Sequence, residues 1–542
     1  FGSRAPLLWT DALFRFDESA MATAASSAPS GEDDAPRIAV VGTGVAALMC
    51  ARTLAQLSRR AEQGPLRGAK IVLCTSRGKL ATQMGPRNQV KPVLGKPYFD
   101  YGCQYFTADE AWFRAEVERL RDLGACQSLP VGQVGTVSAK EGFQPFPEAS
   151  AGACWVGNGG MGPMLERLLE HTSEEFAGTV EHVRGFPDEG QKVVKLAKDP
   201  RTSKWSLGTK AGNRLGPFDF VVGGFAQHLL TDPFLLSGGA AAEGMLRSLR
   251  RVESNQIIAM QVAFEGEDFS MPFIAAHVLG EEALAWVCNN CAKPQQDGRL
   301  GTPGPAHLTL LSTAKFAEEQ FQRNPQGYRR AAETQMLAAL ARVLGMQDLA
   351  RFRPRVNRIN HWEDGLPVNT PPASRGCLFD AEQGLGWCGD FCVTPGIQGA
   401  ALSGQAMAQN LAAFLAGPAA FDKAGLLPAD EAWAPIGGGE GGGAVLDMGA
   451  FARSTGLRPV STHTDLVPSA IGGYDKAAQL GGSALRGGPG DARDGDARGG
   501  GRGKGKGKGP ERRLAPDGNA YTKAEFKSFF GAYSEWDSAI GA

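Results

Sequence analysis

The sequence lacks the run of about 18 apolar residues that a membrane-spanning helix requires. It also lacks a net charge of either sign, because 56 lysines and arginines stand against 57 aspartates and glutamates. The chain as a whole therefore has no net field to attract nucleic acid or an anionic membrane, and a charged partner must bind a local patch. We expect no membrane partner.

Histidine and cysteine motifs are also missing. None of the seven histidines belongs to a recognisable nucleophile or metal motif, and the ten cysteines are scattered. Cys50 and Cys74 stand in apolar surroundings, which indicates reduced thiols in an intracellular protein rather than a disulfide framework. Cys288 and Cys291 have CxxC spacing, but no second pair follows at zinc-finger distance. We favour packed thiols over a metal site there.

The first residues carry no clear targeting signal. Met21 opens a segment rich in alanine and serine that contains Glu32, Asp33 and Asp34, whereas transit peptides are poor in acidic residues. We predict a disordered leader over residues 1–35. Cytoplasm is the expected compartment, with a plastid or another organelle as the alternative.

The C-terminal part is dominated by glycine and charge. We predict a disordered glycine-rich tail over residues 417–518, because so few large apolar side chains cannot offset the entropy lost on ordering. The run 498–513 is locally basic, and we favour a solvated spacer there over a contact with RNA. Thr522 and Glu525 fit a capping box, which predicts a short helix within 519–542.

Between these ends, strand-like runs alternate with helical patterns. KIVLC (70–74), FDFVVGG (218–224) and IIAMQVAF (257–264) predict strands, while AWFRAEVERLRDLG (111–124) and YRRAAETQMLAALARVLG (328–345) predict helices. Such alternation is typical of an α/β protein with a substantial sheet.

The stretch PRIAVVGTGVAALMCARTL (36–54) predicts a dinucleotide-binding loop. An apolar strand ends at Val41, and a helical pattern follows the glycines. Gly42 permits the tight turn, Gly44 lets a pyrophosphate approach the backbone, and Ala47 lets the helix lie close to the strand. The context of strand, loop and helix raises this motif above a chance glycine turn.

The second predicted strand departs from the usual dinucleotide pattern. An acidic residue normally ends this strand and binds a ribose hydroxyl, but Cys74 and Thr75 stand there. Either Thr75 or Ser76 supplies a weaker hydrogen bond, or the nucleotide is held mostly elsewhere.

An ordered set of motifs resembles one known family. TSRG (75–78), YFDYGCQYFTADEAWF (98–113), WVGNGGMGPMLERLLE (155–170), WVCNNCAKP (286–294), HLTLLSTAKFAEEQF (307–321) and CGDFCVTPGIQGAALSGQAMAQNL (388–411) occur in the order found in renalase-like FAD-dependent amine oxidases. The resemblance covers roughly residues 37–415. It implies an α/β fold in which a Rossmann-like FAD-binding domain is interrupted by an α+β substrate domain. The implied FAD-binding parts are 36–100, 155–235 and 355–416, and the implied substrate parts are 101–154 and 236–354.

The resemblance also implies a set of FAD contacts. Gly42, Gly44 and Ala47 would meet the pyrophosphate, Val180 would lie near the adenine, and the helix that begins near Gly396 would point its N-terminus at the flavin pyrimidine. The full set is Gly42, Thr43, Gly44, Val45, Ala46, Ala47, Thr75, Ser76, Arg77, Gln104, Val180, Gly389, Asp390, Ile397, Gln398 and Ala400. Arg77 or Arg87 would replace an arginine that the family has elsewhere. We expect non-covalent FAD rather than attachment to Cys388 or Cys392.

Flavin chemistry requires no nucleophilic triad, so we nominate no catalytic residue. Tyr105, Phe106, Asn290 and Trp362 are predicted to face the substrate, with packing at a domain boundary as the alternative. The resemblance implies hydride transfer from a small reduced substrate, either a dihydronicotinamide isomer or an amine, with oxygen as electron acceptor. The competing hypothesis is a degenerate flavoprotein fold that serves as an interaction module.

Overall fold

The computed structural model describes most of the residues that the sequence predicts to be globular. The described ranges are 35–60, 64–75, 99–100, 102–146, 154–185, 189–225, 228–264, 269–295, 297–301, 306–371, 375–428 and 433–435, with three short strands nearer the C-terminus. The chain divides into a first unit of residues 1–474 and a second of residues 475–542. The predicted leader, apart from residue 35, lies outside the described residues.

The first unit contains a doubly wound, Rossmann-like sheet of six strands. Its order is β19 (Leu378–Asp380), β20 (Leu385–Trp387), β12 (Phe220–Gly223), β1 (Arg37–Val41), β2 (Lys70–Thr75) and β8 (Val180–Arg184). The strands from β20 to β8 are parallel, and β19 pairs antiparallel at the edge. Both faces of the parallel strands are covered, which explains why their sequences are continuous apolar runs rather than alternating ones.

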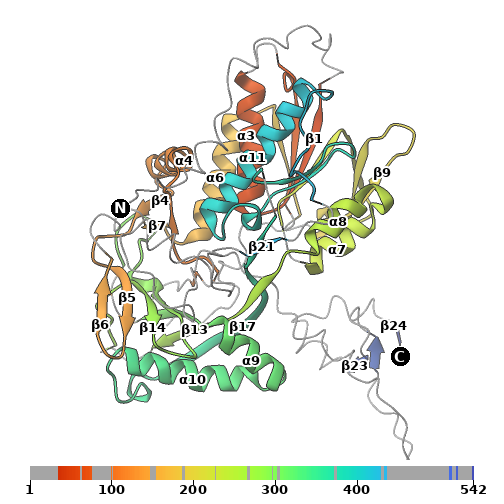
Figure 1. Cartoon of the computed structure of the whole chain (residues 1–542). Coiled ribbons are helices and arrows are strands. Elements are labelled where there is room, and N and C mark those ends of the chain that lie inside the picture. The colour runs from red at the N-terminus through yellow and green to blue at the C-terminus, as the bar shows by residue number, and fades with distance from the viewer. Residues whose placement is uncertain are drawn as a thin grey trace, which may run out of the picture. The chain divides into compact units, whose positions relative to one another are not determined.

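Helices α3 (Val45–Arg60), α6 (Met161–Glu175) and α11 (Ile397–Ala416) pack together on one side of this sheet (Figure 1). Gly404 of α11 lies against α3 so closely that a Cβ atom there would overlap the carbonyl oxygen of Ala46. The other face is covered by β9 (Val193–Lys198), β10 (Trp205–Thr209), β11 (Arg214–Phe218), α7 (His228–Leu236) and α8 (Glu243–Leu249).

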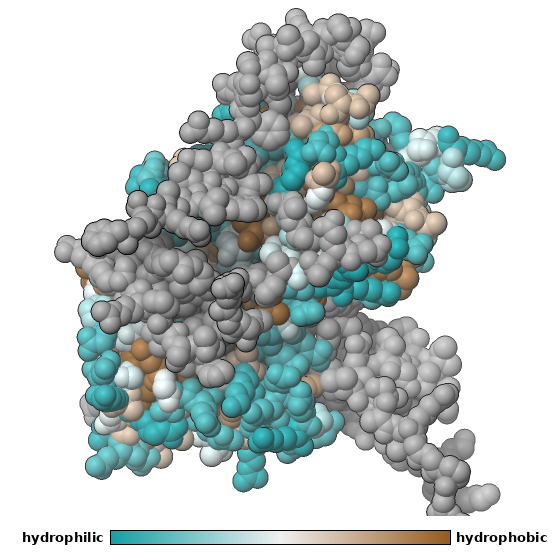
Figure 2. All heavy atoms as spheres, viewed as in Figure 1, coloured by the Kyte–Doolittle hydropathy of each residue, from teal (hydrophilic) through white to brown (hydrophobic). Residues whose placement is uncertain are grey.

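A second, seven-stranded sheet lies below the first in Figure 1. Its order is β17 (Pro354–Pro367), β13 (Ser254–Phe264), β16 (His307–Leu311), β15 (Trp286–Asn289), β14 (Ala275–Leu279), β5 (Val134–Ser138) and β6 (Gly142–Pro145). Helices α9 (Ala314–Arg323) and α10 (Tyr328–Val343) lie between β16 and β17 in the chain. The amphipathic α9 buries Phe316, Ala317 and Phe321, and hydrophilic residues dominate the described surface of that region in Figure 2.

Short elements complete the first unit. They are α4 (Ala111–Asp122), a sheet of β3 (Phe106–Thr107), β7 (Cys154–Gly157) and β4 (Cys126–Ser128), the pair β18 (Asn369–Thr370) and β21 (Ala434–Pro435), and the 3₁₀ turns η3 (Glu189–Gln191), η4 (Gly239–Ala242), η5 (Asn290–Ala292), η6 (Ala350–Phe352) and η7 (Asp390–Cys392). One continuous cluster of buried apolar side chains contains residues from both large sheets, for example Ile38 of the first and Trp286 of the second.

No described helix has both the length and the apolar character needed to span a membrane.

The structure shifts one division that the sequence suggested. We expected residues 355–416 to return to the nucleotide-binding part, but β17 pairs antiparallel with β13 along residues 354–367. The chain rejoins the six-stranded sheet only at β19. A 14-residue strand that pairs with an 11-residue one keeps the chain in the second sheet for longer than the motifs alone indicate.

The predicted tail also begins too early. Leu426 is fully buried, the ring of Phe421 packs 5.5 Å from that of Phe414, and β21 pairs with β18. These apolar side chains give residues 417–428 enough buried surface to pack on the body. In the second unit, β22 (Arg512–Leu514) pairs with β23 (Ala520–Thr522) and β24 (Ile540–Gly541), so strands occur at both ends of the segment 519–542, while the residues between them, where the helix was expected, lie outside the described residues. Glu525 and most of the tail lie outside the described residues.

Candidate dinucleotide-binding site

The six-stranded sheet has a switch point between β1 and β12. From β1 the chain adds β2 and β8 on one side, whereas β12 and β20 lie on the other. In open sheets of this kind, ligands bind outside the carboxyl ends of the strands at such a point. Gly42 follows β1 and Gly224 follows β12, and the Gly224 N–H donates to the carbonyl oxygen of Val41 at 2.8 Å.

Glycine is required at both positions for reasons of space. A Cβ atom on Gly42 would stand 2.8 Å from Cβ of Ala47 and 3.1 Å from the carbonyl oxygen of Gly224. A Cβ on Gly224 would come within 2.6 Å of the same Ala47 atom. The three small residues therefore form a bare backbone cradle at the switch point. The sequence motif identified two of them, and Gly224 was missed.

The first turn of α3 has free hydrogen-bond donors. Within the described part of the chain, no group accepts from the N–H groups of Gly44, Val45, Ala46 or Ala47, and the first bond of the turn runs from Leu48 N to the oxygen of Gly44 at 3.2 Å. A helix N-terminus with free N–H groups favours an anion. Thr43 and Gly44 are partly exposed, while Val45, Ala46 and Ala47 are buried side chains that face the core.

Helix α11 begins on the same side of the sheet. It runs from the carboxyl end of β20 back toward the start of β12, where Phe414 packs 6.1 Å from Phe220. Its residue Gly404 lies between Ala46 and Cys50 of α3. Gly404 is seven residues into α11, about 10.5 Å from its start at about 1.5 Å of rise per residue, and its contact with α3 lies about three residues, or about 4.5 Å, from Val45. Measured along the helix axes, α11 therefore begins roughly 6 Å beyond the start of α3. The two predicted helix starts are thus neighbours.

Asp390 and Gly389 prepare the start of α11. Oδ2 of Asp390 accepts from the N–H of Gly396 at 3.1 Å, and the N–H of Gly389 donates to Oγ of Ser403 at 3.0 Å. Burial raises the pKa of Asp390 to about 6, although its backbone N–H partners oppose the shift. The carboxyl group therefore holds the turn that precedes the helix.

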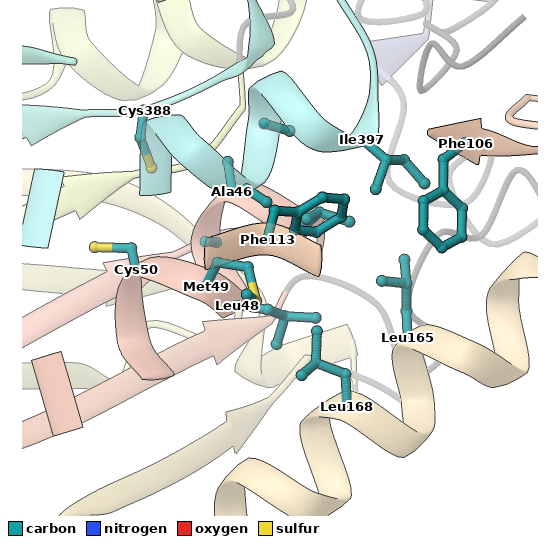
Figure 3. Packing of buried hydrophobic residues seen from close by; sticks show 14 of the residues in the cluster. Ala46, Leu48, Met49, Cys50, Phe106, Phe113, Leu165, Leu168, Cys388 and Ile397 are labelled. Carbon is teal, nitrogen blue, oxygen red and sulfur yellow. The ribbon is translucent and has the colours of Figure 1, made fainter. Parts of the chain in front are cut away.

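The predicted contacts on α11 divide into two kinds. The side chain of Ile397 points toward Phe106 in the apolar core (Figure 3), and Ala400 is also buried. Gln398 is used differently, because its Oε1 accepts from the N–H groups of Asp109 at 2.6 Å and Glu110 at 3.0 Å. Gln398 therefore satisfies donors at the start of α4 with its side-chain oxygen, which leaves its Nε2 and its backbone N–H as the groups it could offer to a cofactor.

Val180 lies away from the glycine loop along the strand direction. It pairs in register with Ile71 near the amino end of β2, whereas the glycine loop follows the carboxyl end of β1. Val41 pairs with Cys74 of β2, and Cys74 pairs with Val183 of β8. Val183, rather than Val180, is therefore level with the last residue before the glycine loop. Thr75 ends β2 as predicted and contacts His182. Ser76, Arg77 and Arg87 lie outside the described residues.

A buried ion pair lies between the two large sheets. Nζ of Lys293 contacts Oδ2 of Asp100 at 3.0 Å, and neither side chain is exposed. The same Nζ donates to the carbonyl oxygen of Gln104 at 2.6 Å, and Oδ1 of Asp100 accepts from Met161 N, at the start of α6, at 3.0 Å. Burial lowers the pKa of Lys293, but its attraction to Asp100, together with Cys288 and Cys103, outweighs burial and leaves the pKa raised.

Gln104 itself is fully buried. Its Nε2 donates to the carbonyl oxygen of Gly102 at 3.0 Å, while its Oε1 has no partner among the described residues. Asn290 holds the same segment, since its Oδ1 accepts from Asp100 N at 3.2 Å and its Nδ2 donates to Thr309 Oγ1 at 3.0 Å.

The four predicted substrate-facing residues have almost no exposed surface. Tyr105, Phe106, Asn290 and Trp362 are at most 2% exposed. The Tyr105 ring stacks on Trp286 at 5.3 Å, and its hydroxyl lies 3.3 Å from Nε2 of His277. All four are packed within the described structure, and their role toward a substrate stays a prediction.

The cysteines remain thiols. All ten are free. Cys288 is fully buried and Cys291 partly so, and no group of three or more metal-ligating side chains occurs among the described residues. A hydrogen bond with Cys50, together with burial, raises the pKa of Cys388 well above its usual range, and burial does the same for Cys392.

Comparisons with known proteins complete this description. No protein-family model matches the sequence. An oxidoreductase from Methanosarcina mazei is 12% identical, over 69% of this chain and 100% of its own, with a TM-score of 0.46. A putrescine oxidase triple mutant, from a redesign of cofactor binding, is 14% identical over 71% and 99%, with a TM-score of 0.44. Aklavinone-11 hydroxylase, in a complex with FAD and aklavinone, is 14% identical over 71% and 63%, with a TM-score of 0.42.

Proposed function

We propose that the protein is an FAD-dependent oxidoreductase that binds its cofactor non-covalently. The observation that carries this proposal is the pair of helix starts at one edge of the six-stranded sheet. Helix α3 opens beside a cradle without Cβ atoms, and α11 opens roughly 6 Å further on. A dinucleotide has a diphosphate and a ring system at separate points along its length, which suits two such helix starts.

The residues fit this cofactor in distinct ways. The N–H groups of Gly44 to Ala47 would hold the pyrophosphate, and Asp390 would lie near the ribityl or phosphate region. The N–H groups of Ile397, Gln398 and Gly399 have no partner among the described residues, so they favour negative charge near the flavin pyrimidine. When bound, FAD supplies hydride acceptance from the substrate and return of the electrons to an acceptor.

The substrate part of the proposal depends on the family resemblance of the sequence. We propose a small reduced substrate, either a dihydronicotinamide isomer or an amine, and oxygen as acceptor. No side chain is assigned as a general acid or base. The buried Lys293 and Asp100 pair holds the segment that runs between the two sheets, and so positions backbone rather than substrate.

The test begins with purified full-length chain. A yellow preparation with flavin absorbance, or a colourless one that becomes yellow with added FAD, is expected. Anaerobic addition of dihydronicotinamide isomers and of a panel of amines should bleach the flavin with one class, and air should restore the colour. Protein that takes up no FAD would overturn the proposal.

One observation favours a second function. No carboxylate ends β2, where a ribose ligand is usual, since Thr75 occupies that position. A fold that has lost its cofactor could serve as an interaction module. Failure to bind FAD, together with unchanged thermal stability when FAD is added, would support this alternative.

A further inference from the structure

Three side chains meet at the carboxyl ends of β2 and β8. Oγ1 of Thr75 lies 2.8 Å from Nε2 of His182, and Nε of Arg184 donates to Nδ1 of the same histidine at 3.1 Å. Thr75 pairs in register with Arg184. Because alternate residues of a strand share a face, His182 and Arg184 lie on one face of β8. We call Thr75, His182 and Arg184 the ribose-side cluster.

The cluster lies close to the glycine loop. Val41, the residue before Gly42, pairs with Cys74, which precedes Thr75. Thr75 lies on the same face of β2 as Leu73, which belongs to the core cluster that also contains α3. Thr75 is therefore on the side of the sheet where the α3 N–H groups are free, at the place where a dinucleotide fold holds its adenosine ribose.

The hydrogen bonds assign the proton of His182. Arginine can only donate, so Nδ1 of His182 must accept, and Nε2 then carries the proton and donates to Thr75. Burial, and then Arg184, lowers the pKa of His182 to about 4, which keeps the ring neutral near pH 7. The hydroxyl proton of Thr75 remains free to be donated elsewhere. Glu181 lies on the opposite face of the strand, since it is one residue from His182.

Among the residues that the structure describes at the ends of β2 and β8, the cluster therefore offers donors and no carboxylate acceptor. The guanidinium of Arg184 is exposed and has further N–H groups, and the Thr75 hydroxyl adds a short donor. A ribose with two free hydroxyls needs an acceptor for its own protons, which the usual acidic residue provides. A phosphate on the ribose presents only acceptor oxygens to an arginine and a hydroxyl.

We propose that the ribose-side cluster makes this site prefer an adenine nucleotide that carries a phosphate on its ribose over one with two free hydroxyls. The proposal rests on the proposed function, because that function places an adenosine at the end of β2. It goes further in naming a second ligand class that would compete with FAD for the site, because FAD has free ribose hydroxyls and would bind without this contact.

The experiment compares two probes that differ by one phosphate. Adenosine 2′,5′-bisphosphate and AMP are titrated calorimetrically into full-length chain freed of bound flavin. The bisphosphate should bind at least about tenfold more tightly. Arg184→Gln should reduce that preference to about threefold or less and leave AMP binding nearly unchanged. Thr75→Glu, which supplies the missing acceptor, should reverse it.

A matched control separates this contact from general charge. Arg201 is an exposed arginine that follows β9, and Arg201→Gln should leave the preference unchanged. Equal affinity of the two probes, or a preference that Arg184→Gln does not alter, would overturn the inference. If the chain binds FAD but neither probe, the inference fails and the proposed function stands. If it binds the bisphosphate selectively but not FAD, the proposed function fails instead.

Discussion

Nζ of Lys293 lies 3.0 Å from Oδ2 of Asp100, 193 residues away in sequence, and both side chains are shielded from solvent. Asp100 also accepts from the first N–H of α6, and Lys293 donates to the backbone of Gln104. The pair thus fastens the segment between the two sheets at three points. A buried charge that loses its partner is costly, whereas two neutral residues in its place need not be.

Lys293→Met should lower the free energy of unfolding by about 3–5 kcal/mol, because it leaves the Asp100 carboxylate buried without a counter-charge. Urea denaturation at pH 7 measures this difference. The double variant with Asp100→Asn is the control, and it should recover part of the loss. A single variant within about 1 kcal/mol of the wild type would contradict this account.

Gly42→Ala should weaken FAD binding by about tenfold or more, because the added Cβ would crowd Ala47 and the Gly224 carbonyl. To relieve this overlap the loop must move from the position in which its N–H groups would face the ligand, and a loss of about 1.4 kcal/mol of binding free energy corresponds to a factor of ten in Kd. Flavin fluorescence quenching measures the affinity. Gly417→Ala is the control, since a Cβ there meets nothing within 4 Å. Equal affinities for the two variants would argue against the cradle.

Gln398→Leu should destabilise the protein by about 1 kcal/mol, because the N–H groups of Asp109 and Glu110 lose their acceptor at the start of α4. Gln398→Glu keeps an acceptor and should remain within about 0.5 kcal/mol of the wild type. Thermal unfolding of the FAD-free chain distinguishes the two. If Gln398→Leu instead leaves stability unchanged and weakens FAD binding, the side chain serves the cofactor.

Asp390 should give the stability a definite pH dependence. Its pKa in the folded chain is about 6, above the value of about 3.9 expected when unfolded. The folded state therefore favours the protonated carboxyl group. The contribution of Asp390 to the free energy of unfolding is fully present below about pH 4 and is lost as the pH rises through about 6. The unfolding free energy of the wild type relative to Asp390→Asn should fall by at most about 3 kcal/mol between pH 4 and 7. A flat difference would mean that the carboxyl group is not perturbed.

Local patterns in the sequence predicted much of the fold. The helix predicted over 111–124 is α4, that over 328–345 is α10, and the apolar run 70–74 forms most of β2. The strand, glycine loop and helix from residue 37 onward also follow prediction, whereas the start of α11 near Gly396 was expected from the family resemblance alone. Each signal lies within a few neighbouring residues, where hydrophobic spacing and turn chemistry act directly.

Long-range relationships could not be predicted in the same way. The position of Val180 depends on the register of β8 against β2, and an isolated strand pattern does not specify register. The acceptor role of Gln398 depends on α4, which lies 288 residues earlier in the chain. Lys293 stood in a motif that suggested the family, yet nothing local indicated Asp100 as its partner.

The contact of Gly404 with the backbone of Ala46 has a consequence for ligand choice. Because no side chain separates α3 from α11 at this point, neither helix can slide along the other without a clash. The distance between the N-termini of α3 and α11 is then fixed by their packing. Under the proposed function, a ligand would have to present one group to each N-terminus, as the diphosphate and the flavin ring of FAD would.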